Sequence, residues 1–114
     1  MKKLLIALCL VPSISFANLY SCTGAGFSIE VTGNPAVMKV VGNGFNTVAQ
    51  NARLSATFDT VIIANTTSPA ATVKLTIKDS SFAGPGDRFT SNVQVSSANG
   101  VADYNGLTCI RGND

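Results

Sequence analysis

The chain carries Tyr20-Ser21-Cys22 near its start and Leu107-Thr108-Cys109 near its end. Because side chains alternate between the two faces of a strand, Tyr20 and Cys22 share one face, and so do Leu107 and Cys109. We predict that these stretches lie on neighbouring strands and that a Cys22–Cys109 disulfide joins the N- and C-terminal strands. The chain between them must therefore leave the first strand and return to it.

Alternation of apolar and polar residues, the signature of half-buried strands, dominates the sequence from Leu19 onward. It is clearest in residues 72–78, where Thr and Lys separate the apolar positions. One buried face and one solvent-exposed face are typical of antiparallel sheets. The predicted inward residues of three such runs are Val73, Leu75 and Ile77; Leu54, Ala56 and Phe58; and Phe89, Val93 and Val95.

Two Asn-Gly pairs suit hairpin turns, because Asn and Gly accept the positive φ that such turns need. They are Asn99-Gly100 and Asn105-Gly106, and we expect the second to join residues 101–104 to 107–111 through a two-residue loop. Between residues 53 and 63 there is too little chain for a relaxed hairpin, so we predict one long strand with a bulge near Asp59. That bulge would turn the side chains of Val61 and Ile63 inward.

The predicted strands number eight, and residues 45–52 have room for one turn of helix. The strands lie near 19–23, 27–32, 36–41, 53–63, 72–78, 88–96, 101–104 and 107–111. An even number of sequential antiparallel strands with bonded ends predicts a small all-β, up-and-down antiparallel barrel, since closure removes exposed edges. A two-sheet β-sandwich is the alternative. The lack of Trp, common in immunoglobulin-type cores, favours the barrel.

The N-terminus resembles a bacterial export signal. Lys2 and Lys3 precede an apolar run over residues 4–11, and Ser15-Phe16-Ala17 suits cleavage. We therefore predict a signal peptide at 1–17 and a single all-β domain at 18–114, which is 97 residues long. The apolar run is too short to span a bilayer, so we expect no transmembrane segment after signal removal.

Cysteine usage agrees with a periplasmic or extracellular location. Cys9 would leave with the signal, so Cys22 and Cys109 remain as an even pair for an oxidising compartment. An alternative is a lipid anchor, because residues 19–22 resemble a lipobox in which Cys22 would be lipidated. That alternative would leave Cys109 as an odd thiol.

Charge excludes two classes of partner. Of eight Lys and Arg residues, two leave with the signal, and the remaining six balance six Asp and Glu residues. A neutral chain without basic clusters has no electrostatic footprint for nucleic acid and no patch for an anionic membrane.

Catalytic chemistry is also poorly supported. The chain has no His, so Ser-His-Asp and Cys-His systems and His-ligated zinc are excluded. No Gly-rich phosphate loop and no calcium loop is present, so we expect no cofactor and no metal. A carboxylate pair for glycoside hydrolysis, with Asp79 and Asp87 flanking the longest loop, stays possible. We expect instead that the scattered acids are surface groups and turn caps.

Two loops are the candidate binding sites, because binding residues concentrate on loops held by a rigid scaffold. One loop covers residues 42–52 and the other 79–88. Alternatively, their aromatic rings plug the ends of the barrel. The candidate residues are Asn43, Phe45, Asn46, Gln50, Asp79, Phe82, Asp87 and Arg88.

These features predict an exported, non-enzymatic module that binds a protein or glycan outside the cytoplasm. The pattern Tyr20-x-Cys22, followed by β-rich sequence and a late cysteine, resembles bacterial periplasmic lysozyme inhibitors, which are small β-barrels. The resemblance covers only those residues and implies an inhibitor of a secreted enzyme. The chain lacks a counterpart of that family's Ser-Gly motif and Lys-Gly-Asp stretch, so no site residue is carried over. A structural subunit of a cell-surface assembly is the third hypothesis.

Overall fold

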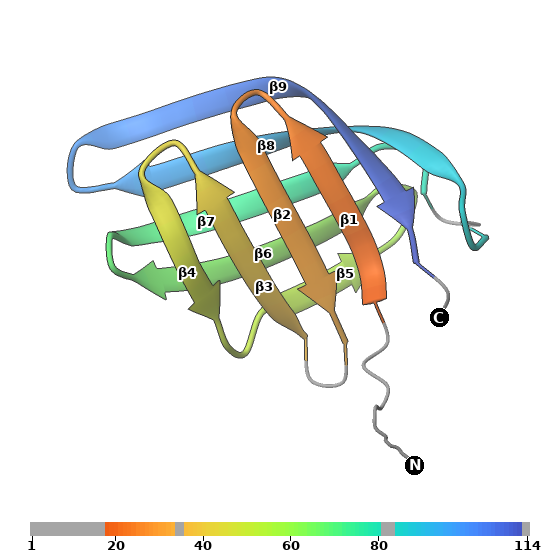
Figure 1. The fold of residues 1–114 in the computed structure, drawn as a ribbon, viewed down its shortest axis with the longest axis horizontal. Coiled ribbons are helices and arrows are strands. Elements are labelled where there is room, and N and C mark those ends of the chain that lie inside the picture. Colours follow the sequence, from red (N-terminus) through yellow and green to blue (C-terminus); the bar gives the residue numbers. More distant parts are fainter. Residues whose placement is uncertain (1–17, 34–35, 81–83, 113–114) are drawn as a thin grey trace, which may run out of the picture.

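The computed structural model describes residues 18–33, 36–80 and 84–112, which form one antiparallel β-sheet (Figure 1). No helix occurs among these residues, and hence none that is long and apolar enough to cross a membrane. The nine strands are β1 (Asn18–Gly24), β2 (Phe27–Thr32), β3 (Val37–Gly42), β4 (Phe45–Ala49), β5 (Arg53–Ala56), β6 (Thr60–Thr67), β7 (Ala70–Ile77), β8 (Arg88–Ser97) and β9 (Gly100–Arg111).

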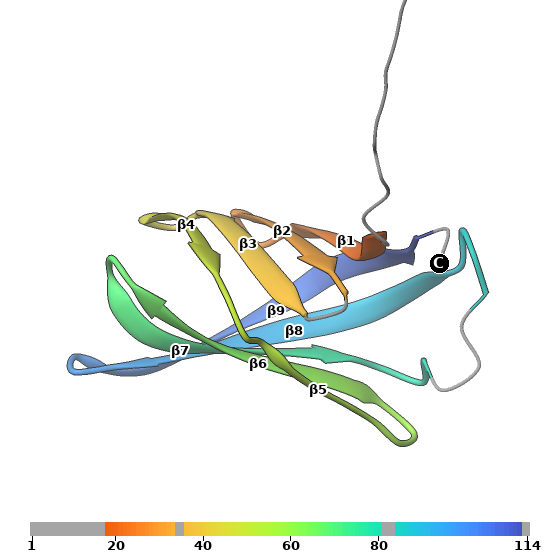
Figure 2. The same cartoon turned by 90° about the horizontal axis from the view of Figure 1, so that it is seen from below.

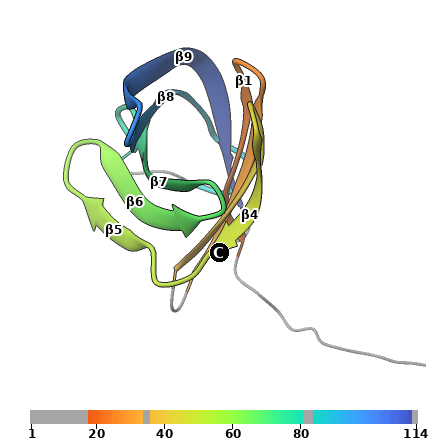
Figure 3. The same cartoon turned by 90° about the vertical axis from the view of Figure 1, so that its left-hand side faces the viewer.

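The strand order is β4-β3-β2-β1-β9-β8-β7-β6-β5. Each strand therefore pairs with its neighbour along the chain, with a single interruption between β4 and β5, while β1 and β9 pair at the centre. The sheet curls until β4 contacts β6, which produces a half-open barrel (Figure 3). The predicted all-β, barrel-like antiparallel class is thus confirmed.

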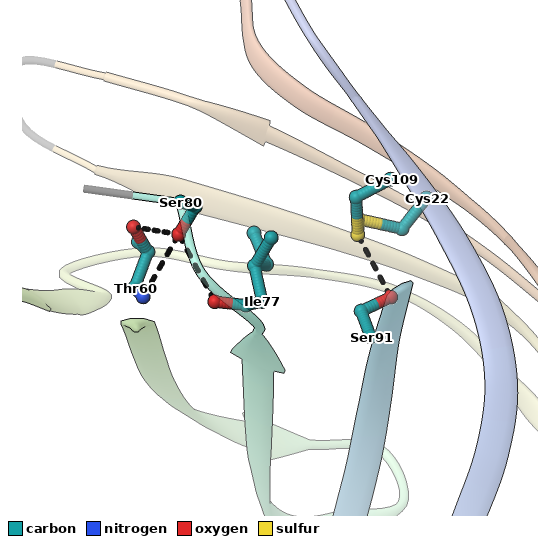
Figure 4. The surroundings of a disulfide bond; sticks show 6 residues. All are labelled: Cys22, Thr60, Ile77, Ser80, Ser91 and Cys109. Atoms are coloured by element: carbon teal, nitrogen blue, oxygen red, sulfur yellow. Dashed lines mark hydrogen bonds between the residues drawn. A yellow bond between two sulfur atoms is a disulfide. The ribbon is translucent and has the colours of Figure 1, made fainter. Parts of the chain in front are cut away.

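The disulfide joins the two central strands. Cys22 lies directly opposite Cys109 in the pairing of β1 with β9, and both side chains are fully buried. The hydroxyl of Ser91, on β8, lies 3.0 Å from the Cys109 Sγ and donates to it (Figure 4). The predicted bond between the terminal strands is confirmed, and it leaves Cys22 without a thiol for a lipid anchor.

The inward side chains of the sheet form the core. Val73, Leu75 and Ile77 are buried as predicted. Of the predicted inward residues on β8, Val93 is buried, whereas Phe89 and Val95 are only half-buried and pack against the core from its edge. Fully buried side chains from the other strands are Ile29, Val31, Met38, Val40, Ile62 and Leu107.

Residues 53–63 form a hairpin, so the prediction of one bulged strand was wrong. Strand β5 pairs with β6 through a turn at 57–59, in which the Thr57 N–H donates to the Asp59 carbonyl at 3.1 Å. On β6, Ile62 is buried while Val61 and Ile63 are half-buried, the reverse of the predicted facing.

The apolar side chains of β5 and its turn are also exposed, contrary to prediction. Leu54 is 44% exposed and Phe58 is 69% exposed, and Ala56 is exposed as well. The physical reason is position: β5 is the last strand of the sheet, and no strand among the described residues pairs with its outer edge.

Two further strand predictions were wrong. The hairpin between β8 and β9 turns at Ala98-Asn99, one residue before the predicted pair, and Gly100 is the first residue of β9. Asn105-Gly106 does not make a second hairpin, because β9 continues through it. Gly106 (φ 87°) is instead the extra residue of a bulge, between the pairs Ser91–Leu107 and Asn92–Asn105. Residues 45–49, where a helical turn was expected, are strand β4.

Candidate functional site

The connections between strands gather at two ends of the barrel. The hairpin end contains the turns β1–β2, β3–β4, β6–β7 and β8–β9. The terminal end contains both described chain ends together with the connections β2–β3, β4–β5, β5–β6 and β7–β8. In Figure 1 the β6–β7 and β8–β9 turns lie at the left.

The structure places the two predicted binding loops at opposite ends, so they do not form one site. Asn43 and Phe45 lie at the hairpin end, and Gln50 follows β4 on the way to the terminal end. Asn46 is exposed on β4, opposite Val41. The remaining candidates at the terminal end are Asp79, Asp87 and Arg88, all exposed, while Phe82 lies outside the described residues.

Phe45 closes the hairpin end from inside. Its side chain is 8% exposed, and its ring centroid lies 6.2 Å from that of Phe27. Phe27 in turn meets Tyr104 edge to face, with centroids 4.9 Å apart. This arrangement agrees with the alternative in which the ring plugs the barrel. Three aromatic rings, those of Phe45, Phe27 and Tyr104, therefore pack together at the hairpin end.

Asn43 fixes the rim of the hairpin end. It occupies the β3–β4 turn with φ of 50°, a conformation that Asn tolerates better than most residues. Its Nδ2 donates to the Ala25 carbonyl in the β1–β2 turn at 2.9 Å. The side chain therefore ties two neighbouring turns together.

A pocket of about 420 Å³ opens at this end between three turns. Asn43 and Phe45 border one side, the β6–β7 turn a second side, and the β8–β9 hairpin with Tyr104 the third. None of the lining residues is charged. Asp103 lies next to Tyr104 on β9 but is exposed, and the Gln94 amide on β8 donates to it at 3.1 Å.

The lining offers apolar surface with a few hydrogen-bonding groups. Tyr104 is half-buried, and Val101 at the rim is 65% exposed. Ser97, Asn99 and Asn43 supply the hydroxyl and amide groups. Apolar and polar surface therefore contribute about equally to the lining.

Sequence reasoning missed most of this pocket. The sequence predicts a strand position for Tyr104 and only a hairpin turn between β8 and β9, although both line the pocket. Their proximity to Phe45 depends on β1 and β9 pairing at the centre of the sheet. The sequence signal that was available is the predicted disulfide, which places β9 beside β1 and hence near the β1–β2 turn.

Two of the carboxylates at the terminal end stabilise turns. The Asp59 Oδ1 accepts from the Asp79 N–H, and the Asp87 Oδ2 accepts from the Gly84 N–H, each at 2.9 Å. Within the described ranges, no group of three or more Cys, Asp or Glu side chains lies close enough to hold a metal ion. These carboxylates therefore have a local structural role.

A second, smaller pocket of about 210 Å³ lies at the terminal end, beside β5. The Arg111 guanidinium stacks over Tyr20 at 5.4 Å and donates to the Leu19 carbonyl at 3.1 Å. Ser80 Oγ accepts from the Thr60 N–H and donates to the Ile77 carbonyl, both at 3.0 Å (Figure 4). The polar groups of this pocket are thus largely bonded to the protein itself. The hairpin-end pocket has about twice its volume and is the candidate binding site.

Comparison with protein-family models, with curated proteins and with solved structures finds no match to this chain. Function must therefore be inferred from the geometry of the hairpin end.

Proposed function

We propose that the chain is an exported, non-enzymatic binding module whose site is the hairpin-end pocket. The observation that carries this proposal is an open pocket of about 420 Å³ between the turns of a disulfide-linked sheet. Pockets that hold small ligands or single groups of larger ones have volumes of about 300–1,000 Å³.

The lining chemistry points to an uncharged ligand. A charged group would lose its hydration in the pocket without an opposite charge to replace it, because no charged side chain lines the walls. A sugar unit of a neutral glycan suits the site, since its apolar face can lie on Tyr104 while its hydroxyls meet Asn43 and Asn99. An uncharged loop of a protein partner is the other form that such a ligand can take.

Two features support a module without catalytic activity in an oxidising compartment. The pocket contains no His, Asp, Glu, Lys or Cys side chain, the residues that most often supply general acid–base catalysis or a nucleophile. The buried Cys22–Cys109 bond is compatible with a periplasmic or extracellular location. The export signal predicted at residues 1–17 supports the same location.

The direct test is to block the pocket and compare ligand capture. Ala102 is exposed and lines the pocket, so Ala102→Trp should fill it and abolish capture from neutral glycan arrays and from crosslinked periplasmic extract. Thr108→Trp is the matched control, because Thr108 is exposed on the same strand outside the pocket. Capture by Ala102→Trp equal to that by the unchanged chain, or no specific capture by any form, contradicts the proposal.

A further inference from the structure

The smaller pocket at the terminal end of the barrel, called the terminal-end pocket below, has walls from two parts of the chain. The start of β1 and the end of β9 supply one wall, and β5, the start of β6 and Ser80 after β7 supply the other. These parts lie at the right of Figure 2, with the β5–β6 hairpin at the lower right. Arg111 is the one charged residue of the lining.

The position of Arg111 is fixed by contacts of both its main chain and its side chain. Its N–H donates to the Asp87 carbonyl at 2.9 Å, and its carbonyl accepts from the Gly86 N–H at 2.8 Å. Its guanidinium carbon lies 5.4 Å from the centroid of the Tyr20 ring, and its Nη1 donates to the Leu19 carbonyl at 3.1 Å. A ligand would therefore meet a cation that is already ordered, which lowers the entropy cost of binding.

The pocket has hydrogen-bond donors that the protein does not use. The bond to the Leu19 carbonyl takes one N–H of the guanidinium, and no carboxylate of the described residues pairs with Arg111. The Tyr20 side chain is 4% exposed, yet its hydroxyl has no hydrogen-bond partner in the described ranges, whereas most buried polar groups have one. The hydroxyls of Thr60 and Ser80, by contrast, bond each other at 2.7 Å. Both side chains with spare donors thus lack an acceptor.

The missing acceptor is best supplied by a carboxylate. An ionised carboxylate only accepts hydrogen bonds, and its two oxygens match the planar fork of a guanidinium. A phosphate dianion would leave its second charge unpaired, because the lining contains a single cation. The other wall contributes the apolar side chains of Leu54 and Ala56, and Leu19 adds a third beside Arg111.

The size of the pocket limits the rest of the ligand. Its volume of about 210 Å³ is below the range of about 300–1,000 Å³ that whole ligands occupy, so it suits one end group. Two acidic residues, Asp59 and Asp79, precede Thr60 and Ser80 in the sequence, but neither lines the pocket. The Asp59 carboxylate accepts from the Asp79 N–H instead. Arg111 therefore determines the charge that the pocket accepts.

We propose that the terminal-end pocket binds a carboxylate on a short apolar chain, with Arg111 as its anchor. Such a group occurs in a small branched-chain carboxylic acid and in the C-terminal residue of a peptide that ends in Leu or Val. A structural role in joining β9 to β1 accounts for the bond from Arg111 to Leu19 but not for the unused donors. The site is separate from the hairpin-end pocket and does not depend on the function proposed for it.

Titration of the purified chain with isocaproate and with acetyl-Ala-Ala-Leu, followed by amide chemical shifts, tests the proposal. Saturable shifts around Arg111 are expected with at least one of these two carboxylates. The primary amides of both compounds should produce none, because they carry no charge for the guanidinium, and this comparison needs no variant. Shifts with the free acid alone identify a small molecule as the source of the ligand, and shifts with the peptide alone identify a protein C-terminus.

Variants separate the anchor from the walls. Arg111→Gln should weaken binding at least about tenfold, because a charge-assisted bond is lost while the Gln amide can still donate to the Leu19 carbonyl. Lys74→Gln, which removes an exposed positive charge outside the pocket, is its control. Ala56→Trp should abolish binding by filling the pocket, and Ser55→Trp, at an exposed neighbour outside the lining, should not.

Three results would overturn the proposal. They are the absence of binding by both carboxylates, equal binding of the carboxylates and their amides, and binding that Arg111→Gln leaves undiminished.

Discussion

Phe45 and Phe58 show that residue type alone does not predict whether a side chain is buried. Both follow polar or Gly-containing segments, and the alternation pattern predicted Phe58 to be inward while Phe45 was a candidate for a binding loop. In the structure Phe45 is buried against Phe27, as expected if its ring plugs the barrel, whereas Phe58 is exposed in the β5–β6 turn, contrary to prediction. Alternation gives the facing of a residue only when one face of the strand packs on the core, and the side chains of β5, at the edge of the sheet, are all exposed.

This difference in burial predicts effects of very different size on stability. Phe45→Ala should lower the free energy of unfolding by about 3–5 kcal/mol, because it leaves a cavity among buried side chains. Phe58→Ala should change it by no more than about 0.5 kcal/mol, as expected for an exposed site. Urea unfolding measures both, and similar losses for the two variants would contradict the placement of Phe45 in the core.

At the scale of elements, the sequence predicted where strands occur better than how they connect. Turn chemistry located the β8–β9 hairpin to within one residue, since the turn falls at Ala98-Asn99, but the equivalent pair Asn105-Gly106 forms a bulge because β9 pairs with β8 beyond it. A glycine with positive φ suits either structure, so the local pattern cannot distinguish them. The β5–β6 hairpin was missed for a related reason: three residues, 57–59, suffice for its turn.

The bulge gives a prediction that isolates backbone conformation. A side chain at Gly106 would meet no atom within 4 Å, so replacing it perturbs only φ, which is 87°. We expect Gly106→Ala to cost about 1–2 kcal/mol, and Gly106→Asn to cost less, because Asn adopts left-handed conformations more readily. Thermal melts of the two variants measure this difference. Equal melting temperatures for Gly106→Ala and the unchanged chain would be inconsistent with the bulge.

At the scale of the whole molecule, the sequence predicted the all-β class and the Cys22–Cys109 disulfide. It did not predict between which two strands the barrel is open. The meander returns to its start, so β1 and β9 pair, and the interruption falls between β4 and β5. Short-range patterns contain no information on which neighbouring strands separate. For the same reason the pocket was only half predicted, since Asn43 and Phe45 come from one loop and Tyr104 from a strand 59 positions after Phe45.

Because of this topology, the disulfide is expected to contribute strongly to the stability of the fold. Cys22 and Cys109 are 87 residues apart, and their bond crosses the pair of strands at which the two ends of the chain meet. In the chain-entropy model, a loop of this length contributes about 4–5 kcal/mol by restricting the unfolded chain. For a single domain with a total stability of about 5–15 kcal/mol, that share is large.

We therefore expect the double variant Cys22→Ala/Cys109→Ala to lower the melting temperature by many degrees, because its terminal strands are no longer linked covalently. Ser91→Ala is the control, because it removes the hydroxyl that donates to the Cys109 sulfur but keeps the bond, and should cost only about 0.5–1.5 kcal/mol. Reduction under denaturing conditions followed by refolding in reductant should reproduce the loss without a substitution. A melting temperature unchanged by both treatments would show that pairing of β1 with β9 holds the barrel together without its covalent link.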